Sequence, residues 1–469
     1  MNLNLKPKKV FDFFAEMSEI PRTSYNEKQV SDWLVKFGKD RGLETIQDEA
    51  LNVIIKKPGT PGYENKEAVI LQGHMDMVGE KTSESDHNFE KDPLKLRVVD
   101  GHLYATDTTL GGDNGIAVAM GLAVLDSDDL EHPPIELLVT TAEEVGMDGA
   151  AAVDPKNLDG TRLLNIDSEE EGVFFVSCAG GRVIKVSFEP TFKEVDETGY
   201  ELSIFGLLGG HSGMEIIKQR GNAVKLLGRA LKDIGDVTLS EISGGAKHNA
   251  IPRDAKAIFT SKSIDVEKVK TLCLETFKHE YPEDPIQCEI KEVPVTRLMN
   301  QETSDGIVNY LVIMPDGVQK MMKSMENMVE SSLNSGVMEM DGDTVTVTHA
   351  VRSSSPSRKE EISIQLTSLA EVLGAKAEKF SDYPEWEYDP DSKIKDISLS
   401  VYEKVTGKEP LVQAIHAGLE CGLLKEKMPD VDMISFGPDM ADVHTPNEHL
   451  SIESVERTWN FMVELLKAL

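Results

Sequence analysis

The sequence predicts an α/β protein in which a mostly parallel mixed sheet, flanked by helices, is interrupted by an inserted α+β domain. Short apolar segments alternate with helix-like segments near the N-terminus. Apolar and polar residues alternate from near Gly180, and the pattern of short apolar and helix-like segments returns from about Tyr383. Strands that alternate with helices are typical of parallel sheets, and two-residue alternation is typical of half-exposed antiparallel strands. We therefore expect one domain from residues 1–185 and 383–469, and an inserted domain from residues 186–382.

The first domain begins with the clearest alternation of helices and strands. A capping-box pattern from Ser24 to Glu27 predicts a helix that runs to about Lys39. Small apolar residues at 116–125 predict a second helix, after a Gly-Gly-Asp-Asn-Gly turn at 111–115. Short apolar segments predict three buried strands, at residues 68–72, 135–140 and 163–166.

The inserted domain and the return to the first domain follow in order. Alternating residues predict strands, and periodic apolar residues predict helices. The strands expected in the insertion are residues 182–189, 200–205 and 344–351, and its helices are residues 221–234, 266–279 and 359–373. After a linker at 386–390, we expect a helix at 392–405, a strand at 432–435 and a closing helix at 452–469.

Composition and charge exclude several classes of partner. The chain has 469 residues, is 40% hydrophobic, and carries 49 basic against 82 acidic residues, for a formal charge of −33. Such a surface repels nucleic-acid phosphates and anionic lipids, so we expect neither a nucleic-acid nor a membrane partner. Four cysteines without CxxC spacing, no apolar run of 18 residues and no export signal predict a cytoplasmic protein.

Acids and a histidine follow the three predicted strands of the first domain. His74 and Asp76 follow the first strand, Glu143 and Glu144 the second, and Asp167 the third. Open α/β sheets bind ligands at the carboxyl ends of their strands. If these strands are neighbours, four acids and one histidine meet at one edge of the sheet and can form a metal site.

The spacing within each group limits what its members can do. His74 and Asp76 are two residues apart and point to the same face of a strand, where Asp76 can orient the histidine or bind metal itself. Glu143 and Glu144 are adjacent and diverge, so one can bind metal while the other remains a free base. The alternative for His74 and Asp76 is a structural histidine beside a surface acid. The alternative for Glu143 and Glu144 is a pair of solvated surface glutamates.

Two further candidate ligands lie elsewhere in the chain. Asp113 lies in the Gly-Gly-Asp-Asn-Gly turn, where the backbone can bend tightly and a carboxylate can bridge two metals. The same residues are also common in ordinary turns. His444 lies in Asp-Val-His-Thr-Pro-Asn, just after the strand expected at 432–435. Each candidate alone is unremarkable, but their order along the chain forms a pattern.

That pattern resembles the M20 family of metallopeptidases, and within it the aminoacyl-histidine dipeptidases, or cytosol non-specific dipeptidases. The resemblance runs from about residue 70 to the C-terminus. The segments that carry it include LQGHMDMVGE, DTTLGGDNGIAVAM, TTAEEVGMDGA, LLNIDSEEEG, GLLGGHSGMEI, HNAIPRDA, QAIHAGLECGLL and HTPNEHLSIESV.

The resemblance implies a centre of two divalent metal ions. By it, His74 and Asp167 bind one ion, Glu144 and His444 bind the other, and Asp113 bridges them. Zinc is the expected metal, and N/O ligands also suit cobalt or manganese.

The resemblance also implies roles around the metals. Glu143 would be general base and acid, Asp76 would orient His74, and the insertion would be a lid domain. In the lid, His211 would stabilise the developing oxyanion. The residues that the resemblance makes candidates for substrate binding are Asn249 and Arg352, for the C-terminal carboxylate, and His416 and Glu420, for the free amine. An ordinary surface charge for Arg352 and structural roles for His416 and Glu420 remain equal alternatives.

The activity expected from this set is two-metal hydrolysis of dipeptides with broad specificity, including Xaa-His dipeptides, and the resemblance implies a homodimer. A tripeptidase or an N-acyl-amino-acid deacylase would use the same metal core. A non-catalytic metal- or peptide-binding protein is the alternative outside enzymes, although binding alone does not require a free Glu143.

Overall fold

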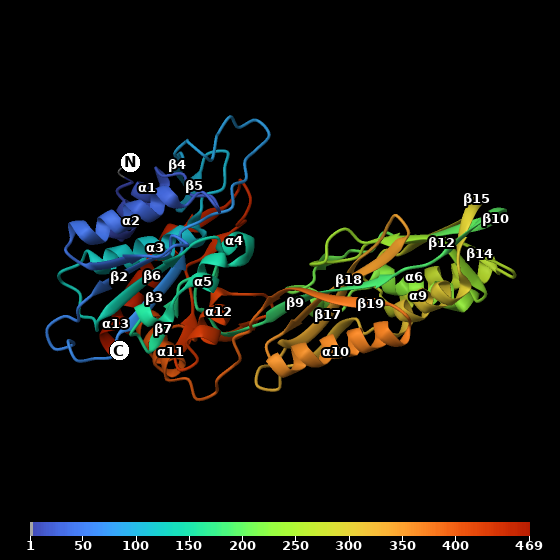
Figure 1. Cartoon of the computed structure of the whole chain (residues 1–469). Helices are drawn as coiled ribbons and strands as arrows, with labels where there is room; N and C mark the ends of the chain where they lie inside the picture. The colour runs from blue at the N-terminus through green and yellow to red at the C-terminus, as the bar shows by residue number, and fades with distance from the viewer. Residues whose placement is uncertain (1–2) are drawn as a thin grey trace. The chain divides into compact units, whose positions relative to one another are not determined.

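The computed structural model describes residues 3–469, so residues 1 and 2 of the first predicted domain lie outside the described residues. The chain forms two compact units (Figure 1). The first unit contains residues 3–177, 388–414 and 419–469, and the second contains residues 178–387 and 415–418. The catalytic and lid roles that the sequence assigned to residues 1–185 with 383–469, and to 186–382, stay predictions.

The first unit is built on an eight-stranded sheet. Its strands follow the order β1 (Glu44–Gln47), β2 (Val53–Lys57), β6 (Ile135–Thr140), β3 (Val69–His74), β7 (Arg162–Asn165), β21 (Asp432–Ser435), β8 (Val173–Cys178) and β20 (Leu411–Ile415). The four central strands β6, β3, β7 and β21 are parallel, and antiparallel pairings flank them. This is the mixed α/β class that the sequence predicted.

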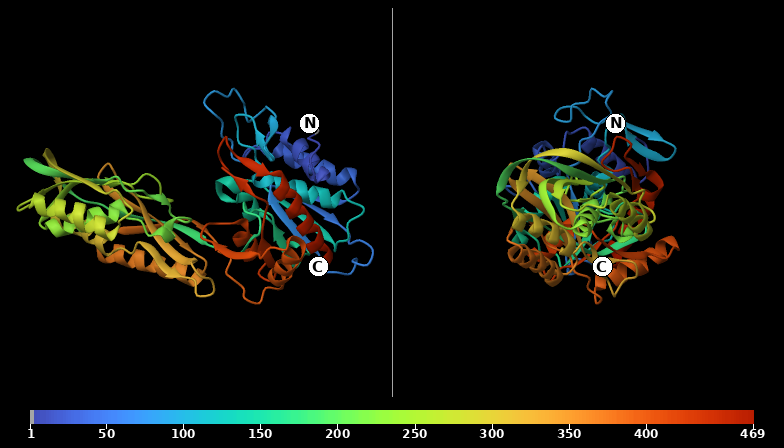
Figure 2. Two further views of the ribbon diagram at one scale, coloured as in Figure 1. Left: turned by 180° about the vertical axis from the view of Figure 1, so that it is seen from behind. Right: turned by 90° about the vertical axis from the view of Figure 1, so that its right-hand side faces the viewer.

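Helices flank this sheet (Figures 1 and 2). α1 packs on α3 and α3 packs on β3, whereas α11 packs on α13 and β21. The helices of this unit are α1 (Lys8–Ser18), α2 (Lys28–Asp40), α3 (Gly112–Leu125), α4 (Glu143–Gly146), α5 (Asp148–Ala152), the 3-10 helix η1 (Pro155–Asn157), α11 (Lys393–Thr406), α12 (Glu420–Lys427) and α13 (Ile452–Ala468).

A second, four-stranded antiparallel sheet belongs to the same unit. Its order is β22 (Met440–Ala441), β23 (His449–Ser451), β5 (His102–Ala105) and β4 (Leu96–Val99). The segment between β22 and β23 carries His444, so this small sheet holds the loop of one predicted ligand.

The predicted capping box at Ser24 and Glu27 is wrong, although the helix that it announced exists as α2. Glu27 occupies the cap position without a side-chain cap bond. Ser24 Oγ instead donates to Asp76 at 2.8 Å, and the Glu27 carboxylate accepts from the Ala142 N–H at 3.0 Å. The helix α1, whose apolar residues Phe11 and Phe14 are fully buried, was not predicted from the sequence.

The second unit is built on one antiparallel sheet. Its path is β15 (Gln287–Met299), β10 (Phe192–Phe205), β14 (Ala255–Ser261), β12 (Val237–Gly244), β17 (Val329–Asp341), β18 (Thr344–Ser353), β9 (Gly180–Phe188) and β19 (Lys376–Tyr383), and β16 (Gly317–Met321) pairs with β17. A separate short pair joins β11 (Gly210–His211) to β13 (Ala250–Ile251).

Helices pack on this sheet and bury its alternate residues. Ile184, Val186 and Phe188 of β9 all belong to the core, as two-residue alternation predicted. The predicted helix at 266–279 is interrupted by a π-helix. The helices of this unit are η2 (Ile216–Lys218), α6 (Ala223–Ile234), α7 (Val266–Thr271), η3 (Leu272–Phe277), α8 (Lys278–Glu280), α9 (Gln301–Ile313) and α10 (Pro356–Val372).

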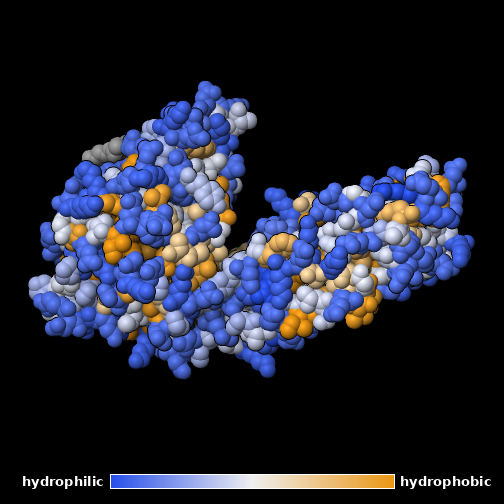
Figure 3. Space-filling model, viewed as in Figure 1, coloured by the Kyte–Doolittle hydropathy of each residue, from blue (hydrophilic) through white to orange (hydrophobic). Residues whose placement is uncertain are grey.

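The surface agrees with the composition. Figure 3 shows hydrophilic side chains over most of the viewed face of each unit, as expected for a chain with a formal charge of −33. Within residues 3–469, no helix combines the length and the apolar character needed to cross a membrane.

Candidate metal centre

His74 ends the central strand β3 and is fixed by contacts on both ring nitrogens. It is 1% exposed. Its Nδ1 lies 3.3 Å from Asp76 Oδ1, and its Nε2 lies 3.1 Å from Asp113 Oδ1. A histidine that ligates metal through one nitrogen is usually oriented by an acceptor at the other. Asp76 therefore lies where an orienting carboxylate is expected, and Nε2 of His74 is the nitrogen that could bind a metal.

Asp113 lies between the two histidines. It lies at the start of α3, two residues after Gly111, whose φ of 63° is left-handed. One carboxylate oxygen, Oδ1, contacts His74, and the other, Oδ2, lies 3.2 Å from His444 Nε2. A carboxylate that offers one oxygen to each side has the arrangement needed to bridge two ions.

Glu143 and Glu144 begin the short helix α4, which is separated from the end of β6 by two residues. Their backbone N–H groups donate to the two oxygens of Asp76, at 3.1 and 3.3 Å. Glu144 Oε2 lies 3.0 Å from His444 Nε2. Asp76 thus connects the end of β3 with the turn that presents both glutamates.

Ligand atoms of these residues form overlapping groups. Asp167 follows β7, and its Oδ1 lies 3.7 Å from His74 Nε2. Among residues 3–469, three groups offer ligand atoms that all lie within 4.8 Å of one another: His74, Asp113 and Asp167; Asp113, Glu144 and His444; and His74, Glu143 and Glu144. The first two share Asp113, and Glu143 belongs to neither of them.

The buried carboxylates strongly perturb each other. Burial raises the pKa of Glu143 and of Asp167 well above the usual range, and neighbouring carboxylates raise both further, against the opposing charge of His74. Hydrogen bonds that His444 donates to the carboxylates of Asp113 and Glu144 raise the pKa of His444 to about 11. Negative charge is therefore in excess at this edge of the sheet.

The residues fit divalent cations. Glu144 Oε1 is buried and has no hydrogen-bond partner, although such atoms are normally satisfied. The donors are imidazole nitrogens and carboxylate oxygens, which suit zinc, cobalt or manganese. Two cations would offset the excess negative charge and displace the protons that these groups otherwise bind.

Glu448, which the sequence analysis missed, holds the loop of Asp113. Its carboxylate is buried, and it accepts hydrogen bonds from the N–H groups of Leu110, Gly111 and Gly112 at 2.7, 3.0 and 2.8 Å, and from Asp113 at 3.4 Å. The one indication in the sequence is an acid four residues after His444. Glu448 therefore fixes the direction in which the loop presents its carboxylate.

Arg22, which was also missed, joins the same loop to the end of β3. It is 2% exposed and donates to the carbonyls of Met75, Asp76 and Gly111 at 2.9, 3.2 and 2.6 Å. Burial lowers the pKa of Arg22 to about 10, against the opposing effect of surrounding carboxylates that include Glu448. The guanidinium remains charged at neutral pH and supplies a fixed cation behind the site.

The backbone N–H groups that bind the Glu448 carboxylate lead to a specific prediction. Glutamine at this position offers one acceptor oxygen, and its NH₂ group would face N–H donors. Each buried donor left unpaired costs about 1–3 kcal/mol. We expect Glu448→Gln to weaken metal binding, measured by competition with a chelator, while Glu453→Gln on the exposed face of α13 leaves it unchanged. Equal metal affinity in both variants would contradict a role for the contact between Glu448 and the loop that carries Asp113.

Two of the residues predicted in the insertion meet in the second unit. β11 pairs with β13 so that His211 lies opposite Ala250, next to Asn249. The Asn249 carbonyl accepts from the Ser212 N–H at 2.9 Å. His211 Nδ1 accepts from the N–H groups of Gly213 and Met214, at 3.3 and 3.1 Å. Its Nε2 therefore carries the hydrogen of the neutral ring.

Arg352 and His416 lie close to that pair in the same unit. A Cβ placed on Gly213 would lie 2.5 Å from His416 O and 3.3 Å from Arg352 Nε. Arg352 donates to Tyr383 at 2.9 Å, and its buried Nε has no partner. Burial lowers the pKa of His416 to about 3, and its Nε2 lies 2.7 Å from Ser332 Oγ.

Glu420, the remaining predicted residue, belongs to the first unit. It is fully buried at the start of α12. Its Oε2 accepts from Thr140 Oγ1 at 2.7 Å and from Gln72, while Oε1 has no partner. Burial raises the pKa of Glu420 to about 7. Its bonds to β3 and β6 give it a structural role, and the amine-binding role stays a prediction.

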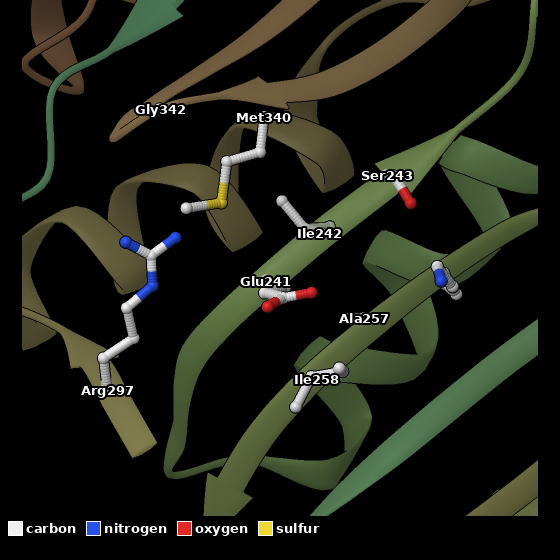
Figure 4. Close-up of a pocket in the computed structure, with 9 residues that line it drawn as sticks. Glu241, Ile242, Ser243, Ala257, Ile258, Arg297, Met340 and Gly342 are labelled. Atoms are coloured by element: carbon white, nitrogen blue, oxygen red, sulfur yellow. The ribbon is translucent and has the colours of Figure 1, made fainter. Parts of the chain in front are cut away.

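One cavity of the second unit has a different character. It has a volume of about 330 Å³ and lies between β12, β14 and the β17–β18 hairpin (Figure 4). Glu241 is the one acid in its lining, Arg297 and Lys256 are its cations, and it contains no histidine. It lacks the convergence of acids and imidazoles that marks the edge of the first unit's sheet.

Comparison with known proteins gives matches over almost the whole chain. The model for peptidase family M20/M25/M40 matches residues 70–468. The chain is 37% identical to the cytosol non-specific dipeptidase of Escherichia coli (strain K12) over 485 aligned positions, which cover 99% of this chain and 98% of the relative.

Solved structures give matches of the same extent. The aminoacylhistidine dipeptidase of Vibrio alginolyticus is 38% identical, with a TM-score of 0.92, and the match covers 100% of this chain and 98% of that one. A tripeptidase of Staphylococcus aureus shares the fold at 16% identity, with a TM-score of 0.57, over 99% of this chain and 98% of that one.

Proposed function

The chain belongs to peptidase family M20/M25/M40, and from this premise we propose that it is a metal-dependent dipeptidase of broad specificity that also accepts Xaa-His dipeptides. The names of the two relatives at 37% and 38% identity support dipeptides as the substrate class. The observation that carries the proposal is the pair of three-residue ligand groups that share Asp113, with the carboxylate of Glu143 beside them.

We assign the ligands as the resemblance implied. His74 and Asp167 hold one divalent cation, Glu144 and His444 hold the other, and Asp113 bridges them. Zinc is our proposed metal, with cobalt or manganese as substitutes, because all three accept imidazole and carboxylate ligands. When bound, such cations polarise a carbonyl and lower the pKa of water toward neutrality.

Glu143 is assigned the proton transfers. Its carboxylate makes no hydrogen bond within residues 3–469 and belongs to neither of the ligand groups that contain Asp113, so it remains available to accept a proton. As general base it takes the proton from the attacking water, and as general acid it gives that proton to the nitrogen of the leaving amino acid.

Three residues keep the reacting groups in place. Asp76 fixes the ring of His74 through Nδ1 and at the same time holds the N–H groups of the Glu143–Glu144 turn. Glu448 and Arg22 both bind the loop that carries Asp113, and Arg22 also binds the carbonyls that follow β3. A preformed arrangement of this kind avoids reorganisation during the reaction.

We propose that the second unit is a lid domain. His211 in this unit is proposed as the hydrogen-bond donor to the oxyanion. Its Nδ1 is occupied by backbone N–H groups, which leaves Nε2–H as the donor. Burial and the positive charge of Arg352 lower the pKa of His211, so the ring stays neutral, and a neutral ring keeps this one hydrogen at Nε2.

Recognition of the peptide termini is proposed for the remaining residues. Arg352 has a buried N–H without a partner, and together with Asn249 it would bind the substrate's C-terminal carboxylate. His416 and Glu420 are proposed for the free amine. A lid that closes during the reaction would favour small peptides.

We further propose that the protein acts in the cytoplasm as a homodimer, on small peptides and without nucleic-acid or membrane partners. The name of the Escherichia coli relative and the small number of cysteines, four without CxxC spacing, support the compartment. The dimer rests on the resemblance.

The central experiment is hydrolysis of a peptide panel by the metal-free protein after addition of Zn²⁺, Co²⁺ or Mn²⁺. We expect dipeptides, including Xaa-His, to be hydrolysed only when metal is added. Faster hydrolysis of tripeptides or N-acyl-amino acids would favour those alternatives. No hydrolysis of any substrate with two metals bound would favour a binding protein.

A lid variant tests the oxyanion assignment. We expect His211→Ala to lower kcat by about 10²-fold or more, because one preorganised donor is lost, while the protein keeps two metals. The matched control is His279→Ala, an exposed histidine of α8 in the same unit. Near-normal kcat in His211→Ala, with metal content measured by elemental analysis, would rule out the role.

A further inference from the structure

His102 and His449 lie side by side on one face of the four-stranded sheet, outside the centre described above. β23 pairs with β5 so that His449 is opposite Tyr104 and Ser451 is opposite His102. The two histidines are therefore diagonal neighbours on that face, within reach of each other. Their ring centroids lie 5.2 Å apart, with the planes at 84°.

Each ring uses Nδ1 for its contacts with the protein. Nδ1 of His102 lies 3.0 Å from Asp100 O, and Nδ1 of His449 lies 3.0 Å from Asn447 O. A carbonyl only accepts, so both Nδ1 atoms carry the hydrogen, and both Nε2 atoms carry a lone pair. Neither Nε2 has a partner among residues 3–469. This is the way in which metal-ligating histidines are usually held.

The separation of the rings agrees with a shared ion. Imidazole nitrogen binds zinc at about 2.0–2.1 Å, so two rings on one tetrahedral ion have centroids about 5 Å apart. One acid and one base lie nearby, because Asp442 Oδ2 is 3.9 Å from His449 Nδ1 and the Arg97 guanidinium lies 4.6 Å from the centroid of Tyr104. Tyr104 stacks on His449 at 4.9 Å and limits the rotation of that ring.

We propose that His102 and His449 form an additional site for a borderline divalent cation such as Zn²⁺, Ni²⁺ or Cu²⁺. Imidazole suits these ions. Water completes the coordination, so binding is weaker than at the five-residue centre. β23 begins directly after Glu448 and shortly after His444, so an ion here ties β5 to the segment that carries both residues.

The test counts metal rather than activity. The protein is first loaded with two equivalents of Zn²⁺ and then dialysed against increasing Zn²⁺, and bound metal is measured by elemental analysis. We expect one further, weaker equivalent. The double variant His102→Ala/His449→Ala should keep the first two and lose the third, whereas the control His279→Ala should keep all three.

Two further measurements guard against a misfolded variant. Zn²⁺ above two equivalents should raise Tm of the unaltered protein by mass action, and should not do so in the double variant. Cu²⁺ added to the two-zinc protein should give an electron paramagnetic resonance spectrum with two imidazole nitrogens. A missing third equivalent, its survival in the double variant, or a spectrum without nitrogen would overturn the proposal. Failure of the five-residue centre would instead remove the first equivalents.

Discussion

Replacement of Glu143 by glutamine is expected to lower dipeptide turnover by about 10²- to 10⁴-fold, while the protein retains two metals. Glutamine keeps the size and the backbone contact to Asp76, so the turn that presents Glu144 stays in place. It cannot accept the proton of the attacking water or return one to the leaving amine. The measurement pairs kcat for a Xaa-His dipeptide with metal content by elemental analysis.

The adjacent residue supplies the matched control for this experiment. Glu144 belongs to the same turn of α4 and lies 3.0 Å from His444 Nε2, in the group that contains Asp113. Glu144→Gln should therefore lose one of the two metals, whereas Glu143→Gln should lose none. If Glu143→Gln turns over dipeptides normally, Glu143 is not the base. If it loses a metal, Glu143 acts as a ligand, as its proximity to His74 and Glu144 would allow.

The meeting of the predicted ligands could be anticipated because parallel strands end at the same edge of a sheet. β6, β3 and β7 are neighbours, His74 is the last residue of β3, and Glu144 and Asp167 follow the carboxyl ends of β6 and β7. The apolar strand segments were sufficient for this, since buried strands are recognisable without long-range information. His444 comes from a distant segment of the chain, and its position beside the other predicted ligands was expected from the resemblance alone. The ligand roles themselves stay predictions.

Glu448 and Arg22 could not be found in the same way. Their partners are main-chain groups of loops more than fifty residues away in sequence, and a backbone carbonyl or N–H carries no residue identity that a sequence pattern could display. The same limit explains the wrong capping box. Ser24 and Glu27 have the right spacing to cap α2, but Asp76 and the Ala142 N–H are buried groups that need partners, and tertiary contacts prevailed over the local ones.

Replacement of Asp113 by asparagine is expected to weaken binding of both metals, which no other single ligand variant should do. Asp113 alone belongs to both groups, with Oδ1 3.1 Å from His74 Nε2 and Oδ2 3.2 Å from His444 Nε2. Asparagine keeps the shape but replaces one anionic oxygen by NH₂, which donates and cannot ligate. The excess of buried negative charge that favours cations also falls.

Asp167→Asn is the matched control, because Asp167 belongs to one of the two groups that contain Asp113. Stepwise competition with a chelator should show one weakened ion in Asp167→Asn and two in Asp113→Asn, at unchanged far-ultraviolet circular dichroism. Two tightly bound ions in Asp113→Asn would remove the bridge. A single weakened ion there would make Asp113 an ordinary ligand of one metal and leave the other held by Glu144 and His444 without it, so the pattern of loss decides how the two sites are connected.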